Sequence, residues 1–103
     1  MWEGLADGSL DLVATDHVAD RLDTEKAVAG GVAFNEISNG APGIETLLTT
    51  LYSEGVSKGR ISLERMVDLL ATSPAARFGL PRKGAIEVGR DADPKAMLEE
   101  YDA

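Results

Sequence analysis

The chain has no cysteine and only one histidine, His17, among its 103 residues. The absence of thiols excludes disulfides and thiolate-bound metals. One imidazole is too few for a zinc site built by this chain from three histidines. No apolar run approaches the roughly 18 residues that span a membrane, and the hydrophobic fraction of 44% is ordinary for a globular domain. We therefore expect a cytoplasmic protein without a membrane partner.

Basic residues are also scarce, since 10 Lys and Arg stand against 18 Asp and Glu and leave a net charge of −8. A surface of this sign repels the phosphate backbone of nucleic acids and anionic membrane surfaces. The composition therefore excludes nucleic acid as an expected partner. The simplest role of the negative charge is solubility.

The clearest periodic pattern covers residues 43–53, where apolar side chains recur at i, i+3, i+4, i+7 and i+8 and predict one helix with a single apolar stripe. The stripe consists of Ile44, Leu47, Leu48, Leu51 and Tyr52. Gly55 is expected to end this helix as its C-terminal cap.

A second helix is predicted over residues 63–71, with Ser62 as its N-cap. Its apolar stripe contains Leu63, Met66, Val67 and Leu70. Ser73 and Pro74 suit the cap and first position of a third helix, which Gly79 ends. We expect these stripes to pack together as the core.

Two short strands are predicted, one near each end of the chain. Residues 10–14 form an apolar run after a helix over residues 2–6 that stops at Asp7-Gly8, and residues 84–89 lie between glycines. Asp93 and Pro94 suit the start of a last helix. The expected fold class is α+β and helix-rich.

Asp16-His17, directly after the first predicted strand, is the only pair that suggests chemistry. A carboxylate at the end of a strand can bind a metal ion or act as general base toward a metal-bound water. Such a pair more often serves as a cap or forms loop hydrogen bonds. Spacing alone leaves both interpretations open.

Five blocks then occur in an order that resembles the cyclic amidohydrolases, most closely the hydantoinase and dihydropyrimidinase group, with dihydroorotases and allantoinases as relatives. The blocks are DGSLDLVATDH (7–17), ISNGAPGIET (37–46), LYSEGVSKGRISLER (51–65), ATSPAARFGL (71–80) and KGAIEVGRDAD (83–93). The resemblance assigns residues 1–93 to the C-terminal segment of such an enzyme. It leaves residues 94–103 as an acidic tail outside the family pattern.

The resemblance implies a metal-dependent (β/α)₈ barrel, usually with zinc, that hydrolyses a hydantoin, dihydropyrimidine or dihydroorotate type of ring. Asp16 matches the family's aspartate at the end of the last barrel strand, which binds the metal and accepts a proton. Asn39 matches a position whose main chain contacts the cyclic amide. His17 follows the motif without being one of the usual ligands.

The chain lacks the histidine and lysine blocks that lie upstream in the family, and it is far shorter than the roughly 250 residues of a whole barrel. Val18-Ala19 replaces the family's usual Ala/Cys-Pro, and Pro94 replaces the start of an apolar strand. We therefore expect a barrel fragment, the last strand and the helices after it, that is inactive and free of zinc on its own. The alternative is a non-catalytic remnant or an oligomerising interaction module. As partners we expect a second copy of the chain or, for the enzyme, the missing barrel part. A disrupted gene and a separately encoded segment would both explain the ending.

Overall fold

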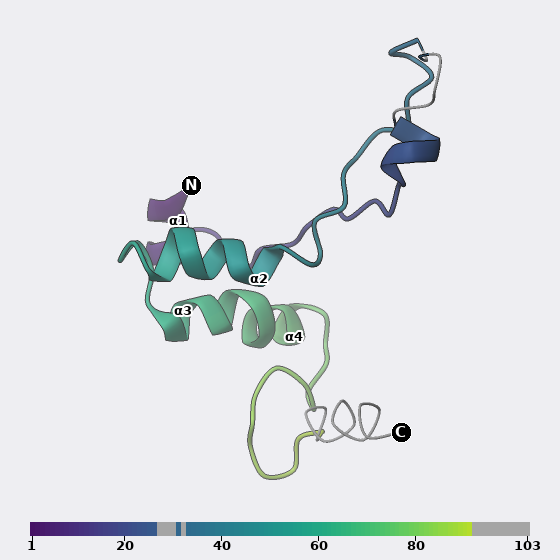
Figure 1. Cartoon of the computed structure of the whole chain (residues 1–103). Helices are drawn as coiled ribbons and strands as arrows, with labels where there is room; N and C mark the ends of the chain where they lie inside the picture. The colour runs from purple at the N-terminus through teal and green to yellow at the C-terminus, as the bar shows by residue number, and fades with distance from the viewer. Residues whose placement is uncertain (27–30, 32, 92–103) are drawn as a thin grey trace, which may run out of the picture.

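Two antiparallel helical stretches form the centre of the molecule in the computed structural model, which describes residues 1–26, 31 and 33–91 (Figure 1). The first stretch is α2 (Leu47–Thr50), continued without a break by the π-helical η2 (Leu51–Val56). The second runs through α3 (Leu63–Val67), the π-helical η3 (Asp68–Thr72) and α4 (Ser73–Arg77). The helix predicted after Asp93 lies outside the described residues.

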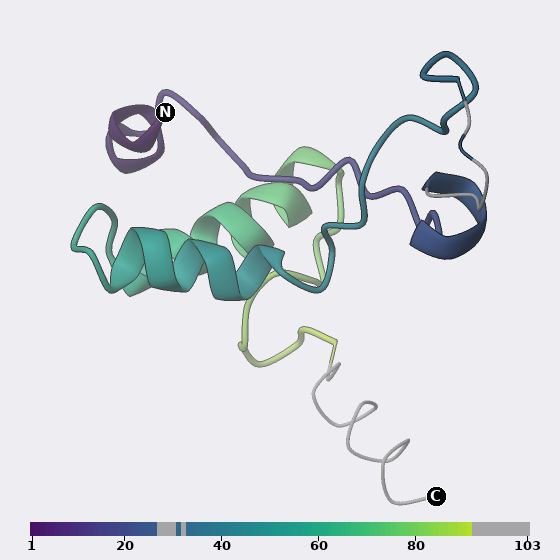
Figure 2. The ribbon, with the colours of Figure 1, turned by 45° about the horizontal axis from the view of Figure 1, so that its top comes forward.

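Two shorter helices complete the described elements. α1 (Trp2–Asp7) ends at Gly8, which adopts the left-handed conformation with φ 88°, as the Asp7-Gly8 pair predicts. The π-helical turn η1 (Leu22–Lys26) lies farther out along the chain (Figure 2).

The start of α3 confirms the predicted cap. Ser62 has extended backbone angles, and its hydroxyl accepts a hydrogen bond from the Arg65 amide at 3.1 Å. This bond satisfies one of the amides that the first turn of a helix leaves without an intrahelical partner. The helix therefore begins where the local sequence predicts it.

The predicted third helix is present as α4, but its predicted Ser73 cap is wrong, because residues 63–77 form one continuous helical stretch. Thr72 and Ser73 both keep right-handed helical angles, and the Ser73 hydroxyl donates to Asp68 Oδ1 at 3.0 Å instead of capping a new helix. A proline inside a helix removes one hydrogen bond and crowds the turn before it. The wider π-helical turn η3 immediately before α4 accommodates Pro74 without a break.

Gly55 does not end its helix either, which corrects a second expectation. It is buried inside η2, and a Cβ added there would lie 3.0 Å from the Ile61 side chain and from the Trp2 ring. Contacts at this distance require a neighbour to move. The glycine therefore serves close packing between η2, α1 and the following loop.

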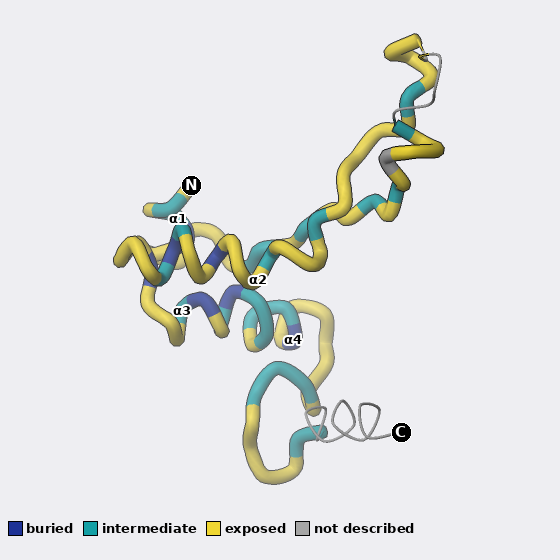
Figure 3. The backbone as a smooth tube through the Cα atoms, in the orientation of Figure 1, coloured by how far each residue is buried: buried dark blue, intermediate teal, exposed yellow. Residues whose placement is uncertain are grey.

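The core lies where the two helical stretches and α1 meet (Figure 3). Its buried members are Leu5, Leu51, Ile61, Met66 and Leu69, with Trp2, Val13, Leu47, Val56 and Leu70 packed against them. Leu69 is completely buried. We refer to α1 and residues 47–77 together as the body.

Only part of each predicted stripe belongs to this core. Ile44, Leu48 and Tyr52 remain 66%, 57% and 51% exposed, and Leu63 and Val67 are each 49% exposed. The periodicity identifies a wide apolar face correctly, but its members point in more than one direction. Leu47 and Leu51 meet the opposite helix, whereas no described element covers the other side of the stripe.

Neither predicted strand forms within the described residues. In the first, Val13 donates its amide to the Leu69 carbonyl at 3.3 Å, so this segment runs along the helices. The second is a loop in which Ile86 and Val88 are fully exposed. A strand is stabilised by pairing with neighbours, and the described chain offers neither segment a partner strand.

The molecule is extended, with a radius of gyration of 17.8 Å, where about 13 Å is expected for a compact domain of this length. The main cause is a long excursion of the chain between residues 10–14, which run along the helices, and α2. This excursion projects away from the helices in both views (Figures 1 and 2). We call the described residues of 15–46 the arm. In the part of the chain described, no helix is both long and apolar enough to cross a membrane.

Candidate functional site

The two ends of the arm meet at one place, close to the body. His17 and Ala41 form a parallel β-bridge, and the Val18 amide donates to the Ala41 carbonyl at 3.2 Å. The structure thereby joins the two sequence blocks that suggested chemistry, TDH at 15–17 and NGAPG at 39–43.

His17 fastens this junction with its side chain. Its Nδ1 accepts hydrogen bonds from the amides of Gly43 at 3.0 Å and Ile44 at 3.2 Å. An Nδ1 that accepts two amide hydrogens carries no proton of its own. Of the two roles left open for the Asp-His pair, the structure thus favours a loop hydrogen bond for His17.

Asp16 has an unusual backbone, with φ at +46°, and is the single non-glycine residue with positive φ in the described chain. Such a conformation costs about 1–2 kcal/mol for an ordinary L-residue, and aspartate tolerates it better than most. The residue is exposed. The turn at Asp16 lies between the extended segment along the helices and the bridge at His17.

Asn39 lies on the returning side of the arm and is exposed. Its two neighbours in the chain are held by one ammonium group, because Lys26 Nζ donates to the carbonyl of Gly40 at 2.7 Å and to that of Ser38. Gly40 has φ 97°, and a Cβ there would lie 2.4 Å from Val18 Cγ2. The loop around Asn39 is thus fixed by a lysine and by a position that only glycine fits.

Lys26 is itself paired with Asp20, whose Oδ2 lies 2.9 Å from Nζ. Both side chains are mostly covered, with 18% and 14% of their surfaces exposed. A hydrogen bond from Ser38, followed by the Lys26 ammonium, lowers the pKa of the Asp20 carboxyl below 3.8. At neutral pH the Asp20 carboxyl is therefore a carboxylate.

The donor groups of this region do not fit a catalytic metal ion by themselves. Among the described residues, no group of three or more His, Asp or Glu side chains is close enough together to hold one. Zinc enzymes use at least three protein ligands, and His17 Nδ1 is engaged with backbone amides. Asp16 can supply one oxygen ligand, so a metal centre at this place needs ligands from beyond the described residues.

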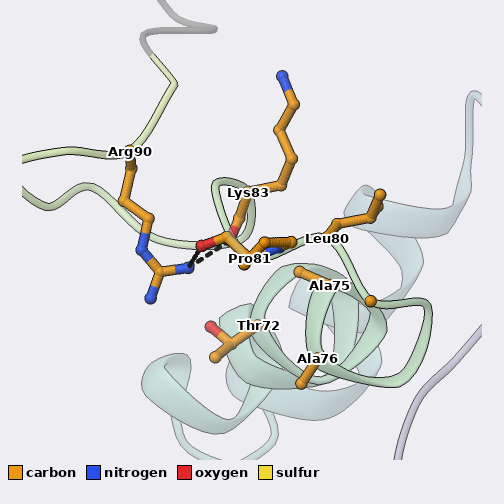
Figure 4. A pocket seen from close by; sticks show the side chains of 8 residues that line it. Thr72, Ala75, Ala76, Leu80, Pro81, Lys83 and Arg90 are labelled. Atoms are coloured by element: carbon orange, nitrogen blue, oxygen red, sulfur yellow. Dashed lines mark hydrogen bonds between the residues drawn. The ribbon is translucent and has the colours of Figure 1, made fainter.

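One surface hollow lies away from the arm, where residues 79–90 fold against α4 (Figure 4). It has a volume of about 520 Å³ and is lined by Thr72, Ala75, Ala76, Gly79, Leu80, Pro81, Lys83 and Arg90. Arg90 Nη1 donates to the carbonyls of Pro81 at 2.8 Å and Lys83 at 3.0 Å. The Arg90 guanidinium is thus engaged in closing the loop.

Another hollow, of about 380 Å³, lies between α1, the extended segment and the first helical stretch. Its lining is almost entirely apolar: Met1, Trp2, Leu5, Leu10, Leu12, Val13, Ala14, Leu47, Thr50 and Leu51. Such a surface offers packing area but no group for acid-base or metal chemistry.

Comparison with known proteins gives this geometry its context. The sequence pattern described as the amidohydrolase family matches residues 1–97. A D-phenylhydantoinase from Escherichia coli O1:K1 is 44% identical over 94 residues, which cover 90% of this chain and 20% of that protein.

Solved structures agree with the sequence comparison. The structure of D-hydantoinase from Bacillus sp. AR9 matches with a TM-score of 0.80 and 48% identity, over 88% of this chain and 20% of that one. The dihydropyrimidinase of Brevibacillus agri NCHU1002 matches with a TM-score of 0.81 and 44% identity over the same shares. This chain therefore spans about a fifth of the length of its relatives, and the resemblance predicted from its five blocks is confirmed: it belongs to the amidohydrolase family.

Proposed function

We propose that this chain is a segment of a metal-dependent cyclic amidohydrolase, which hydrolyses a cyclic amide or imide when the rest of the barrel accompanies it. Hydantoin, dihydropyrimidine and dihydroorotate rings are the substrate class. The observation that carries the proposal is the agreement of sequence and fold with hydantoinases and a dihydropyrimidinase over nearly the whole chain.

Two residues are proposed to act in the assembled site. Asp16 lies after residues 10–14, which we propose as the last barrel strand once neighbouring strands are present, and barrel enzymes place catalytic groups at such strand ends. Its carboxylate would contribute one metal ligand and accept the proton of the attacking water. The main chain at Asn39 would bind the ring amide. As the ring C–N bond breaks, the proton held by Asp16 would pass to the leaving nitrogen, giving an open-chain carboxylate and a ureido group, or an amide group where the ring is a simple imide.

The isolated chain is proposed to be inactive and to retain no stoichiometric zinc, since it supplies too few ligands. Elemental analysis after dialysis tests the second statement. One tightly held zinc ion per chain would show that the chain completes a metal site in some other way.

A direct test grafts this chain onto a relative. The matching fifth of the Bacillus sp. AR9 D-hydantoinase is replaced by residues 1–93, and hydantoin and dihydrouracil hydrolysis are measured. We expect activity from the graft and a loss of at least about a hundredfold in kcat for Asp16→Asn, as for removal of a general base. Asp23→Asn is the matched control, because Asp23 pairs only with the exposed Arg21 at the surface.

A graft that folds and binds metal but hydrolyses neither ring would contradict the proposal. Equal losses in the Asp16 and Asp23 variants would also contradict the role of Asp16.

A second candidate is a non-catalytic interaction module. The exposed apolar side chains of Leu48 and Tyr52, four residues apart on the first helical stretch, and of Ile44 just before it favour this candidate. Sedimentation at two salt concentrations separates the candidates, since screening of the −8 charge should strengthen self-association of such a module. A monomer at high salt argues against it.

A further inference from the structure

We infer that Lys26 is a positioning residue, which holds the main chain on both sides of Asn39 in the shape that receives the cyclic amide. This inference rests on the proposed function. Sequence motifs did not point to Lys26, and the contacts alone identify it.

The first observation is the symmetry of its hydrogen bonds about Asn39. Nζ donates to the carbonyls of residues 38 and 40, which flank Asn39 directly. The Ser38 carbonyl shares a peptide plane with the Asn39 amide, so its bond to Lys26 orients that amide directly. The Gly40 carbonyl belongs to the peptide plane after the Asn39 carbonyl, so its bond to Lys26 holds the chain on the other side of Asn39. The main chain of Asn39 is therefore held between two fixed points by a side chain 12 to 14 residues away.

The second observation is that Lys26 is kept in place by its own partner. Asp20 lies 2.9 Å from Nζ, and both side chains are largely covered although the arm around them is exposed. The ammonium thus donates hydrogen bonds to two carbonyls and forms an ion pair with one carboxylate. Because these three oxygens surround Nζ and its side chain is largely covered, the geometry favours positioning of the loop over contact with substrate.

The third observation is the independent anchor on the other side of the loop. His17 Nδ1 receives the amides of residues 43 and 44, so the loop is fixed at its far end as well. Preorganised main-chain groups bind more tightly because they need not be ordered on binding. Loss of Lys26 should therefore weaken ring binding more than the chemical step.

The test compares Lys26→Met with Lys58→Met. Lys58 is a matched control because it is half exposed and pairs with Glu54 on the surface of the body. In the isolated chain of residues 1–103, we expect the carbonyl ¹³C resonances of Ser38 and Gly40 to move in Lys26→Met and to stay in Lys58→Met. In the grafted hydantoinase, we expect Lys26→Met to raise KM for dihydrouracil about tenfold with kcat changed less than about threefold.

The results test three claims separately: the contact of Lys26 with the loop, its positioning role, and the proposed function. Unchanged Ser38 and Gly40 resonances in Lys26→Met would overturn the lysine contact itself. Moved resonances with an unchanged KM, or with a loss confined to kcat, would overturn its positioning role. An inactive graft carrying the unaltered segment would overturn the proposed function, and with it the claim that the loop receives a cyclic amide. The carbonyl resonances would still decide whether Lys26 holds the loop.

Discussion

The body and the arm are held together by different forces. The body buries Leu51, Met66 and Leu69 between its helices, whereas the arm contributes no buried side chain among its described residues and is fastened by His17, Lys26 and Asp20. The free energy gained by burying apolar side chains grows with the area that they remove from water, and the whole core shares it. Each polar contact of the arm, in contrast, stabilises only the residues around it. The difference teaches that stability and proposed chemistry reside in separate parts of this chain.

The largest expected effect comes from the centre of the body. Leu69→Ala should lower the free energy of unfolding by about 2–5 kcal/mol, because Leu69 is completely buried and its loss leaves a cavity. Leu48→Ala is the control, since Leu48 is 57% exposed and surface substitutions change stability by about 0.5 kcal/mol or less. Urea unfolding measures both, and equal midpoints for the two variants would contradict the observed core.

The next effect concerns the hydrogen bonds by which Arg65 holds α1 and the extended segment after it against the helices. Arg65 Nε donates to the Leu5 carbonyl at 2.7 Å and its Nη2 to the Leu10 carbonyl at 2.9 Å, while Asp68 pairs with Nη1. Arg65→Met should cost about 1.5–3 kcal/mol, the range for hydrogen bonds to a charged group.

Arg21→Met provides the comparison for Arg65. The Arg21–Asp23 pair is exposed on both sides, and exposed ion pairs contribute roughly 0–1 kcal/mol. A thermal melt in which both variants lose the same stability would show that Arg65 does not join the segment to the helices.

A smaller and purely local effect is expected in the arm. Gly40→Ala places a Cβ 2.4 Å from Val18 at φ 97°, so the loop around Asn39 must shift. Amide hydrogen exchange of residues 38–44 should accelerate while the urea midpoint of the body stays within about 0.5 kcal/mol of wild type. A large drop in global stability would mean that arm and body unfold together.

The smallest effect is the response of the arm to acid. Ser38 and Lys26 lower the pKa of Asp20 below 3.8, so the folded arm favours the charged carboxylate. That stabilisation is complete above pH 3.8 and is lost as the pH falls through the lowered pKa. The Gly40 and Ala41 amide resonances should therefore move below pH 3.8, and a transition well above that value would contradict the Asp20–Lys26 pair.

The sequence predicts best those features that depend on neighbouring residues only. The Ser62 cap and the end of α1 at Gly8 follow from local chemistry and are confirmed. Gly55 also looks like a local signal for the end of a helix, and Ser73 like a signal for the start of one. Both predictions failed, because packing against Trp2 decides the conformation at Gly55 and the π-helical turn η3 continues the helix into Ser73.

Features that depend on distant partners could not be predicted. The strand at residues 10–14 requires neighbours that the described chain does not provide. The meeting of His17 with the loop at residues 41–44 could be anticipated only from the family blocks, and Lys26 carries no spacing signal at all. Its role depends on a fold-back of 12 residues to the Ser38 carbonyl.

Native-state hydrogen exchange across the whole chain tests the separation of body and arm most directly. We predict that the amides of Leu51, Met66 and Leu69 exchange only through global unfolding and respond together to urea, whereas those of Gly43 and Ile44 exchange through local opening that urea barely affects. One common opening free energy for both regions, shifted equally by urea, would contradict the account.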